Sequence, residues 1–491
     1  MIVVLLILIP LLTGLAAFFF KDQRSVRFWA LFSSVITLVV SLLSMTLLKD
    51  PQWISFHAAW MESLGSSFSI KLDGLGQMLC LLTAVSYPLI FLATWQTSYR
   101  NAKQFFALML LAQAGLMGVF LSMDALLFYF FWELALIPMY FLCSQWGGEK
   151  RIAVTFKFFI YTFVGSILML VAIIFVHSMT PDNSFSIESF YSAAIPHNQQ
   201  DLLFWLFFLA FAIKMPIFPF HSWQPDTYEQ SPPATTMVLS GVMVKMGVLG
   251  LIRWLLPVLP MASWAWGNVV TSMAIVGMLY ASLIAIRQDN LRRLVAYSSI
   301  AHMGLMCAAI FSVDNLGLQG VMIQLFNHGI NIIGLWIVVD WIEKTTGTRK
   351  ISELGGLAQR APALTILLVI VALANIGLPL TNAFPGEFLM FSGIMGSKAT
   401  IFYAWFTAFA GLTIILAAVY MLNMIRKVFY GEGNSLSAGI RDIGWNEKFA
   451  LGILVAIIFA LGVYPQFLLN MTEEISGFLL GKTDVLHLIK K

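Results

Sequence analysis

The stretch AFAIKMPIFPFHSWQPDTYEQSPP, residues 210–233, places a lysine near the end of an apolar run and follows it with prolines. Pro216 and Pro219, just after Lys214, cannot continue a regular helix, because proline lacks an amide N–H and clashes with the preceding turn. Non-helical backbone at membrane depth is tolerated only inside protein or beside a water-filled cavity. The stretch therefore predicts a broken transmembrane helix with a charge close to the break.

The composition indicates a membrane protein throughout. The chain has 491 residues, of which 59% are hydrophobic and only 11% charged, and its mean hydropathy is +0.86. Soluble domains are about 25% charged. The first apolar run, residues 2–20, is followed rather than preceded by basic residues, which is the reverse of a cleaved signal peptide. We expect an all-α polytopic membrane protein with this run retained and no sizeable soluble domain.

Apolar runs follow one another along nearly the whole chain. A bilayer core requires a helix of about 20 residues, and by that measure we expect about 14 transmembrane spans, of which the seventh and twelfth are interrupted. The expected spans are 2–20, 28–48, 73–95, 104–122, 125–146, 154–177, 202–222, 230–256, 264–286, 293–313, 316–343, 363–396, 401–425 and 448–470.

The basic residues test the number of spans. Of the 28 Lys and Arg residues, 19 fall in connections after odd-numbered spans, 7 fall on the opposite side, and Lys214 and Lys245 lie within spans. By the positive-inside rule the odd connections face the cytoplasm and both termini face the periplasm. One inner loop, SWQPDTYEQSPP, is an exception, because it has no basic residue. A miscounted span would reverse the bias downstream, and no reversal occurs.

A second interrupted span, ALANIGLPLTNAFPGEFLMF at residues 372–391, carries Gly377, Pro379, Pro385 and Gly386 before Glu387. Broken spans five helices apart, each with an ionisable group, are typical of two inverted repeats. We expect N-terminal helices in residues 1–100, a first five-helix repeat in 101–257, a second inverted repeat in 258–430, and a last helix and tail in 431–491.

Six ionisable residues lie within the apolar spans. Each costs at least about 2.5–3.5 kcal/mol at mid-membrane on insertion scales, and such residues commonly build proton relays that face water-filled interiors. Burial penalises a charged lysine and a nearby carboxylate restores it, so a buried lysine can bind or release a proton as its partner approaches or withdraws. The proposed relay residues are Glu133, Lys214, Lys245, His302, His328 and Glu387.

Glu133, in FFWELALIPMYFLC (130–143), has no basic neighbour in sequence, and we expect it to pair with Lys214. The alternatives are that this pair only holds helices together, and that His302 and His328 are satisfied by backbone carbonyls. His221, Asp226 and Glu229 could hydrate a cytoplasmic opening or solvate a loop. We expect Asp73 and Asp124 to cap helix N-termini.

No cofactor motif is found. Cys80, Cys143 and Cys307 stand alone in apolar runs without a CxxC pair, which argues against an iron–sulfur cluster or structural zinc held by this chain. We expect these cysteines to act as small core residues. The sequence has no GxGxxG motif or P-loop, so no nucleotide site is expected.

Four segments resemble a known family. FWELALIPMYFL, the block KMPIFPFHSWQPDTYEQSPPATTMVLSGVMVKMGVLGLIRW, DNLRRLVAYSSIAHMGLM and FNHGINIIGLW look like the antiporter-like subunits of NADH-quinone oxidoreductase (respiratory complex I). The likeness covers almost the whole chain. Sister subunits carry lysine at the twelfth-span exit position, whereas the M-type subfamily, equivalent to mitochondrial subunit 4, carries glutamate there, as this chain does with Glu387. At Asn331, sister subunits tend to have lysine.

This resemblance implies a function. Quinone reduction elsewhere in the complex would change the Glu133–Lys214 pairing, and protons would pass from the cytoplasm through Lys214, Lys245 and the histidines to Glu387 and the periplasm. The implied location is a bacterial inner membrane. The implied partners are other membrane-arm subunits, the lipid bilayer and protons, without nucleic acid; flavin mononucleotide (FMN), iron–sulfur clusters and quinone are expected in partner subunits and none in this chain.

Three other functions remain open. A subunit of a multisubunit sodium/proton antiporter shares the fold and most motifs, although Glu387 argues against it because such relatives usually carry lysine there. A scaffold without transport would have no need of six buried ionisable groups. A solute transporter would fit the broken helices but not the resemblance.

Overall fold

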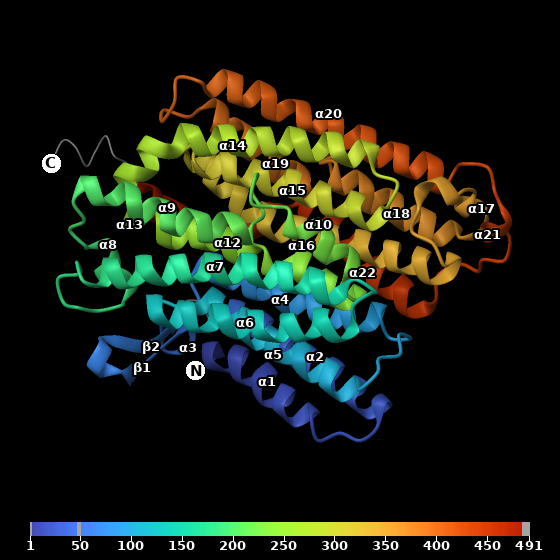
Figure 1. The fold of residues 1–491 in the computed structure, drawn as a ribbon, viewed down its shortest axis with the longest axis horizontal. Coiled ribbons are helices and arrows are strands. Elements are labelled where there is room, and N and C mark those ends of the chain that lie inside the picture. The colour runs from blue at the N-terminus through green and yellow to red at the C-terminus, as the bar shows by residue number, and fades with distance from the viewer. Residues whose placement is uncertain (1, 47–50, 484–491) are drawn as a thin grey trace.

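The computed structural model describes residues 2–46 and 51–483. Most of the described chain is helical (Figure 1). The helices before residue 260 are α1 (Ile2–Ala17), α2 (Gln23–Thr46), α3 (Pro51–Ile54), η1 (Glu62–Leu64), α4 (Gly74–Ala93), α5 (Ala102–Leu121), α6 (Ala125–Trp146), α7 (Arg151–His177), α8 (Ile187–Tyr191), α9 (His197–Lys214), α10 (Trp223–Gln230), α11 (Pro233–Val238), η2 (Leu239–Met243), α12 (Lys245–Gly250), η3 (Leu251–Leu255) and α13 (Leu256–Val258).

The second half of the chain continues the same architecture, with long helices packed side by side (Figure 1). Its helices are α14 (Pro260–Arg287), α15 (Leu291–Ile310), α16 (Asn315–Thr346), η4 (Ile351–Glu353), α17 (Leu357–Arg360), α18 (Pro362–Asn375), α19 (Ala383–Met395), α20 (Tyr403–Val428), α21 (Ser435–Ala438), α22 (Trp445–Val463) and α23 (Gln466–Thr483).

The long helices give the bundle two distinct ends. The strands β1 (Ser55–Met61) and β2 (Ser66–Lys71) lie with α8 and α13 at one end, which we name the hairpin end. Helices α17 and α21 and their loops lie at the other end (Figure 1), which we name the basic end because the connections there carry basic residues such as Lys350, Arg360 and Arg441. Residues 1, 47–50 and 484–491 lie outside the described residues. They include Lys49, Lys490 and Lys491, which the sequence analysis assigned to the side opposite these connections.

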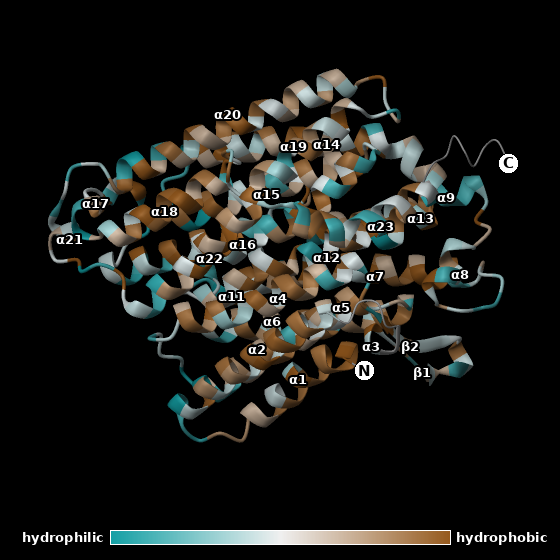
Figure 2. Cartoon of the chain, turned by 180° about the vertical axis from the view of Figure 1, so that it is seen from behind, coloured by the Kyte–Doolittle hydropathy of each residue, from teal (hydrophilic) through white to brown (hydrophobic). Residues whose placement is uncertain are grey.

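The apolar helices agree with the expected membrane protein. Among the described residues, eleven helices are long and apolar enough to cross a membrane, and three shorter apolar helices, α1, α18 and α19, accompany them. Hydrophobic residues predominate along the helices, and hydrophilic ones gather at the ends and loops (Figure 2). The all-α polytopic fold is confirmed. The number of spans, the inverted repeats and their boundaries stay predictions.

Both predicted breaks are present. Helix α9 ends at Lys214, and the chain becomes helical again only at α10. Helix α18 ends at Asn375, and α19 begins at Ala383. One detail differs from expectation: Pro385 and Gly386 belong to the first turn of α19, where proline is tolerated because its missing N–H would have no helical partner. Glu387 therefore stands on a helix, after a break that closes at Asn382.

The helix that carries Lys245 is irregular in a way that was not predicted. Two π-helical turns, η2 and η3, flank the short α-helical segment α12. Such π turns occur frequently at functional sites. Glycines let neighbouring helices approach closely at this point, because a Cβ on Gly241 would lie 2.7 Å from the Ile333 side chain and one on Gly247 would lie 2.7 Å from the Phe211 carbonyl oxygen.

Two further elements were not predicted. Residues 55–71 form an antiparallel hairpin whose turn contains Gly65 at φ 77°. The expected last span, 448–470, is in fact two helices, because α22 ends at Val463 and α23 begins after Pro465. Helix α23 packs back against α4 and α16, and a Cβ on Gly74 would lie 1.6 Å from the Met471 carbonyl oxygen, so glycine is required there.

Candidate functional site

The central contact joins Lys245 on α12 to His328 on α16. The Lys245 Nζ lies 2.8 Å from His328 Nδ1 and donates a hydrogen bond to the Ser240 carbonyl oxygen at 2.9 Å. Lys245 is 0% exposed and His328 is 2% exposed. The irregular turn η2 places the Ser240 carbonyl within reach of a lysine five residues later. The amine therefore has two fixed partners in an otherwise apolar interior, and one of them can accept a proton.

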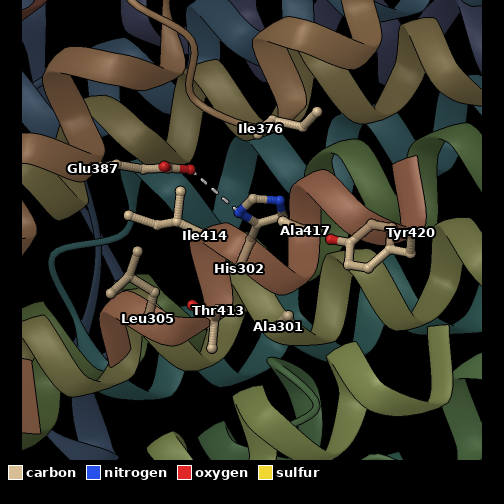
Figure 3. A pocket seen from close by; sticks show the side chains of 9 residues that line it. All are labelled: Ala301, His302, Leu305, Ile376, Glu387, Thr413, Ile414, Ala417 and Tyr420. Atoms are coloured by element: carbon tan, nitrogen blue, oxygen red, sulfur yellow. Dashed lines mark ion pairs between the residues drawn. The ribbon is translucent and has the colours of Figure 1, made fainter. Parts of the chain in front are cut away.

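The row of ionisable groups continues from His328 to Glu387. The other nitrogen of His328, Nε2, lies 3.2 Å from the Ser299 hydroxyl oxygen. The rings of His302 and His328 have centroids 5.6 Å apart. The His302 Nδ1 lies 3.5 Å from Glu387 Oε1 on α19 (Figure 3). The structure thus brings four of the six predicted site residues into one row across the interior: Lys245, His328, His302 and Glu387.

A small cavity lies at the His302–Glu387 contact. Figure 3 shows the side chains of His302, Glu387 and Tyr420 around it, with Thr413 and apolar side chains completing the lining. Its volume of about 20 Å³ suits a single water molecule. A water molecule there would lie beside the His302 imidazole, the Glu387 carboxylate and the Tyr420 phenol. A proton could then pass between His302 and Glu387 through this water without a direct hydrogen bond between them.

Hydroxyl and amide groups that were not predicted surround this row. The Tyr420 hydroxyl donates to the Ser298 hydroxyl at 3.1 Å, and the Asn375 amide donates to the same oxygen at 3.0 Å. Ser298 and Ser299 precede His302 by four and three residues, so all three lie on one face of α15. The SSIAH spacing was the signal that could have identified them.

A polar stripe along α16 faces the second break. Gln324, Asn327, His328 and Asn331 recur at helical spacing and are all buried. Gln324 donates to Glu387 Oε1 at 3.5 Å, and Asn327 donates to the Asn382 carbonyl oxygen at 2.6 Å. One amide oxygen of each of Gln324, Asn327 and Asn331 has no protein partner. Buried polar groups of this kind are commonly satisfied by ordered water, so the stripe is suited to hydration.

The expected ion pair between Glu133 and Lys214 is absent from the described residues. Lys214 is buried, its Nζ has no hydrogen-bond partner, and it lies 5.4 Å from the centroid of the Trp132 ring. Glu133 turns to the other side of α6, toward Ser166 and a surface groove that includes Trp60 and Tyr129. Successive residues on a helix point about 100° apart, so the tryptophan faces the lysine and the glutamate does not. The two charges still interact electrostatically.

Charged groups at the basic end explain the acidic segment. Asp226 accepts from Lys157 at 2.9 Å and from Arg293 at 2.9 Å. The Glu229 carboxylate accepts from Arg293 at 3.0 Å and forms an ion pair with Arg349 at 3.3 Å. The segment SWQPDTYEQSPP lacks basic residues of its own because cations from α7, α15 and the segment after α16 neutralise it. Asp226 and Glu229 lie on helix α10 rather than in a loop, and their ion pairs tie α10 to α7, α15 and the segment after α16.

The predicted helix caps are confirmed. The Asp73 carboxylate accepts from the Gly76 amide at the start of α4, and Asp124 accepts from the Leu126 and Leu127 amides at the start of α6. The three cysteines are buried with free thiols. Within residues 2–46 and 51–483, no group of three or more His, Cys, Asp or Glu residues could hold a metal ion.

The chain is similar to known proteins in both sequence and fold. Residues 122–415 match the family described as NADH:quinone oxidoreductase/Mrp antiporter, transmembrane. NADH-quinone oxidoreductase subunit M of Rhodobacter capsulatus is 35% identical over 474 residues, covering 91% of this chain and 89% of that protein. A chain of respiratory complex I from Thermus thermophilus superposes with a TM-score of 0.90 at 28% identity, covering 98% of this chain and 100% of that chain. A chain of the Mrp complex from Dietzia sp. has a TM-score of 0.84 at 19% identity, which shows the fold alone.

The basic-end ion pairs predict a pH-dependent stability. Burial opposes ionisation of Asp226, but hydrogen bonds from Lys157 and Arg293 lower the pKa of its carboxyl below the ordinary value. A depressed pKa in the folded state stabilises the protein above the unfolded pKa of about 3.9 and ceases to do so as pH falls through the folded value. Asp226→Asn should therefore cost about 0.2–1 kcal/mol at pH 7.

The measurement is thermal unfolding of the purified complex from pH 7 down to pH 3. The difference between wild type and Asp226→Asn should hold to about pH 5 and shrink below about pH 4. Asp201→Asn, at the hairpin end, controls for loss of a carboxylate in general. A difference that grows as pH falls would contradict a stabilising role for the ionised carboxylate.

Proposed function

Because the chain belongs to the NADH:quinone oxidoreductase/Mrp antiporter transmembrane family, we propose that it is an M-type, proton-translocating subunit in the membrane arm of an NADH-quinone oxidoreductase. One observation carries the proposal: the buried row Lys245–His328–His302–Glu387, with contacts of 2.8 Å and 3.5 Å at its two ends. A scaffold would have no use for such a row, because apolar packing stabilises buried helix contacts at least as well as ionic groups do.

The row performs proton transfer between named atoms. The Lys245 ammonium gives a proton to His328 Nδ1 and becomes a neutral amine, and His328 releases its other proton from Nε2 to the Ser299 hydroxyl oxygen, which in turn passes its own proton on toward His302, three residues along the same face of α15. The imidazole takes a proton on one nitrogen and releases one from the other, and its tautomer must be restored before the next proton can pass. His302 Nδ1 then delivers a proton to Glu387 Oε1, directly or through a water in the adjoining cavity.

Lys214 and Glu133 supply the control in this proposal. Among the described residues Lys214 has no hydrogen-bond partner and only the Trp132 ring near its ammonium, so the energy of that ammonium depends strongly on distant charges. Glu133 is the negative charge with which it interacts. Approach of a positive charge from a neighbouring subunit to the Glu133 side of α6 would weaken this interaction and favour loss of the proton from Lys214. Control thus acts at a distance across Trp132 rather than by opening a direct ion pair.

The energy for transport comes from outside this chain. Moving one charge against 100 mV costs about 2.3 kcal/mol, which NADH oxidation and quinone reduction in partner subunits supply. Those partners would hold the FMN, iron–sulfur clusters and quinone. The basic end would face the cytoplasm and the hairpin end the periplasm of a bacterial inner membrane, in agreement with the positive-inside rule. Protons would then leave from Glu387 toward the hairpin end.

A sodium/proton antiporter subunit remains the second candidate. The Mrp chain shares the fold at 19% identity, whereas the relatives named for NADH-quinone oxidoreductase subunit M reach 35% identity over nearly the full length. Glu387 at the exit also favours the M-type assignment. Co-purification of this chain with an NADH-oxidising complex would decide for the oxidoreductase, and co-purification with antiporter subunits alone would decide against it.

Lys245→Ala tests the row itself. Proton pumping should fall by at least about tenfold in assembled vesicles, because a positioned proton-transfer group contributes about 10²–10⁴-fold. Pumping is measured as NADH-driven acidification, at equal amounts of complex on a native gel. Lys398→Ala, which removes an exposed lysine, should leave it unchanged. Normal pumping by assembled Lys245→Ala would remove the row from the mechanism.

Glu133→Ala tests the control of Lys214. The complex should assemble, because Glu133 has no ion pair among the described residues and its interaction with Ser166 is the main polar contact to be lost. NADH-driven proton pumping should be largely abolished, while Glu133→Asp should retain a part because it keeps the charge. A double variant Glu133→Ala/Trp132→Phe separates charge from packing. If Glu133→Ala pumps normally, the carboxylate has no controlling role.

Glu387→Lys and Glu387→Ala, compared at equal assembly, test the exit. If Glu387 exchanges protons, lysine should retain more pumping than alanine, because a buried amine also titrates. If Glu387 is only a counter-ion of His302, 3.5 Å away, lysine adds repulsion and should be worse than alanine. Gln324→Ala, which alters a neighbour of the carboxylate without changing charge, serves as the packing control.

A further inference from the structure

Arg253 is held in a buried site that the proton row does not use. Its Nη2 donates to both oxygens of Asp73, at 2.6 Å and 2.7 Å, and its Nη1 donates to the Phe120 carbonyl oxygen at 2.8 Å. The Arg253 side chain is only 3% exposed. The guanidinium thus connects three elements at the hairpin end: η3, the start of α4 and the end of α5.

The site is enclosed from the hairpin end. The Tyr191 hydroxyl on α8 donates to the Arg253 carbonyl oxygen at 2.9 Å. Helix α23 lies directly over the start of α4, where the Met471 carbonyl oxygen would meet a Cβ on Gly74. The ion pair therefore lies beneath a cover formed by α8 and α23 rather than at an open surface.

The position of Arg253 between Lys245 and the hairpin end indicates what this site does. Arg253 follows Lys245 by eight residues, so it stands about two helical turns closer to the hairpin end. The intervening residues read MGVLGLI and are all buried. On this side Lys245 has apolar neighbours and then a fixed positive charge. On the other side it has His328 at 2.8 Å.

A permanent cation at the end of an apolar segment is a barrier to protons. Arginine stays charged in proteins, and fixed arginines exclude protons and cations from membrane pores. A buried guanidinium is costly without a partner, and Asp73 with the Phe120 carbonyl provides one. We propose that Arg253, held by Asp73, is the seal that prevents a proton on Lys245 from escaping directly to the hairpin end. This inference rests on the proposed function, because it requires Lys245 to carry protons.

The test measures passive proton flow without NADH. Vesicles containing the assembled complex receive an imposed pH gradient, with a potassium ionophore to balance charge, and internal pH is followed. Arg253→Met should increase the proton leak about tenfold or more over wild type. Arg253→Met/Lys245→Ala should restore the wild-type rate, because the leak passes through Lys245. Arg27→Met, which removes another arginine bonded to backbone carbonyls, should not leak.

Two further variants separate the charge barrier from simple support. Asp73→Asn breaks the ion pair but keeps the cation, and asparagine can still cap α4, so its leak should be well below that of Arg253→Met. Arg253→Lys keeps a positive charge and should stay sealed, which provides the test if Arg253→Met does not assemble. No leak in assembled Arg253→Met overturns the seal, and so does a leak in Arg253→Lys.

Equal leaks in Asp73→Asn and Arg253→Met, or a leak that persists without Lys245, would mean that the helices have only loosened, which also overturns the seal. The proposed function fails by a different result, normal NADH-driven pumping in Lys245→Ala. Because the leak assay uses no NADH, the two failures can be told apart.

Discussion

The buried contact between Lys245 Nζ and His328 Nδ1 is the interaction on which the rest of the interior depends. Removing an ammonium from water costs several kcal/mol even after relaxation, and in this site a ring nitrogen and the Ser240 carbonyl replace that water. Helix α12 can bring its amine this close only because Gly241 lets η2 lie against Ile333 on α16. The irregular turns around Lys245 are therefore part of the site and not defects in a span.

The interruption between α18 and α19 is likewise part of the site that holds Glu387. Gly377 adopts φ +76°, which only glycine takes readily, and a Cβ there would lie 2.3 Å from Glu387 Oε2. The carboxylate thus lies against bare backbone at the interruption between α18 and α19. At both interruptions a polar side chain satisfies a backbone carbonyl inside the protein, Trp223 at Ile213 and Asn327 at Asn382, as non-helical backbone at membrane depth requires. The break and the ionisable group are two parts of one arrangement.

Much of this arrangement could be predicted because ionisable residues are conspicuous in apolar runs. Lys245, His328, His302 and Glu387 were predicted in this way, and the structure brings them together. Ser299 and Tyr420 were not predicted, because hydroxyl groups are ordinary in transmembrane helices. The Glu133–Lys214 ion pair was wrong for a reason of helix phase: α6 turns Trp132 toward Lys214, and one sequence does not fix the rotation of a helix about its axis. The strands of the hairpin are short, and α23, although 18 residues long, is interrupted by Glu473, Glu474 and Lys482, so neither stands out as an apolar run.

The gaps in the row are as necessary as its contacts. If every step from Lys214 to Glu387 were a short hydrogen bond, protons would equilibrate in both directions and a gradient would dissipate through the protein. The structure instead combines a 2.8 Å contact at Lys245 with a 3.5 Å separation at Glu387 and an unpartnered Lys214. A charge that arrives elsewhere in the complex can shift the protons of this row from one arrangement to another only if it stabilises one arrangement more than the other. The loose positions, Lys214 and the His302–Glu387 cavity, are where the energies of two states can differ, so they are where coupling to redox chemistry must act.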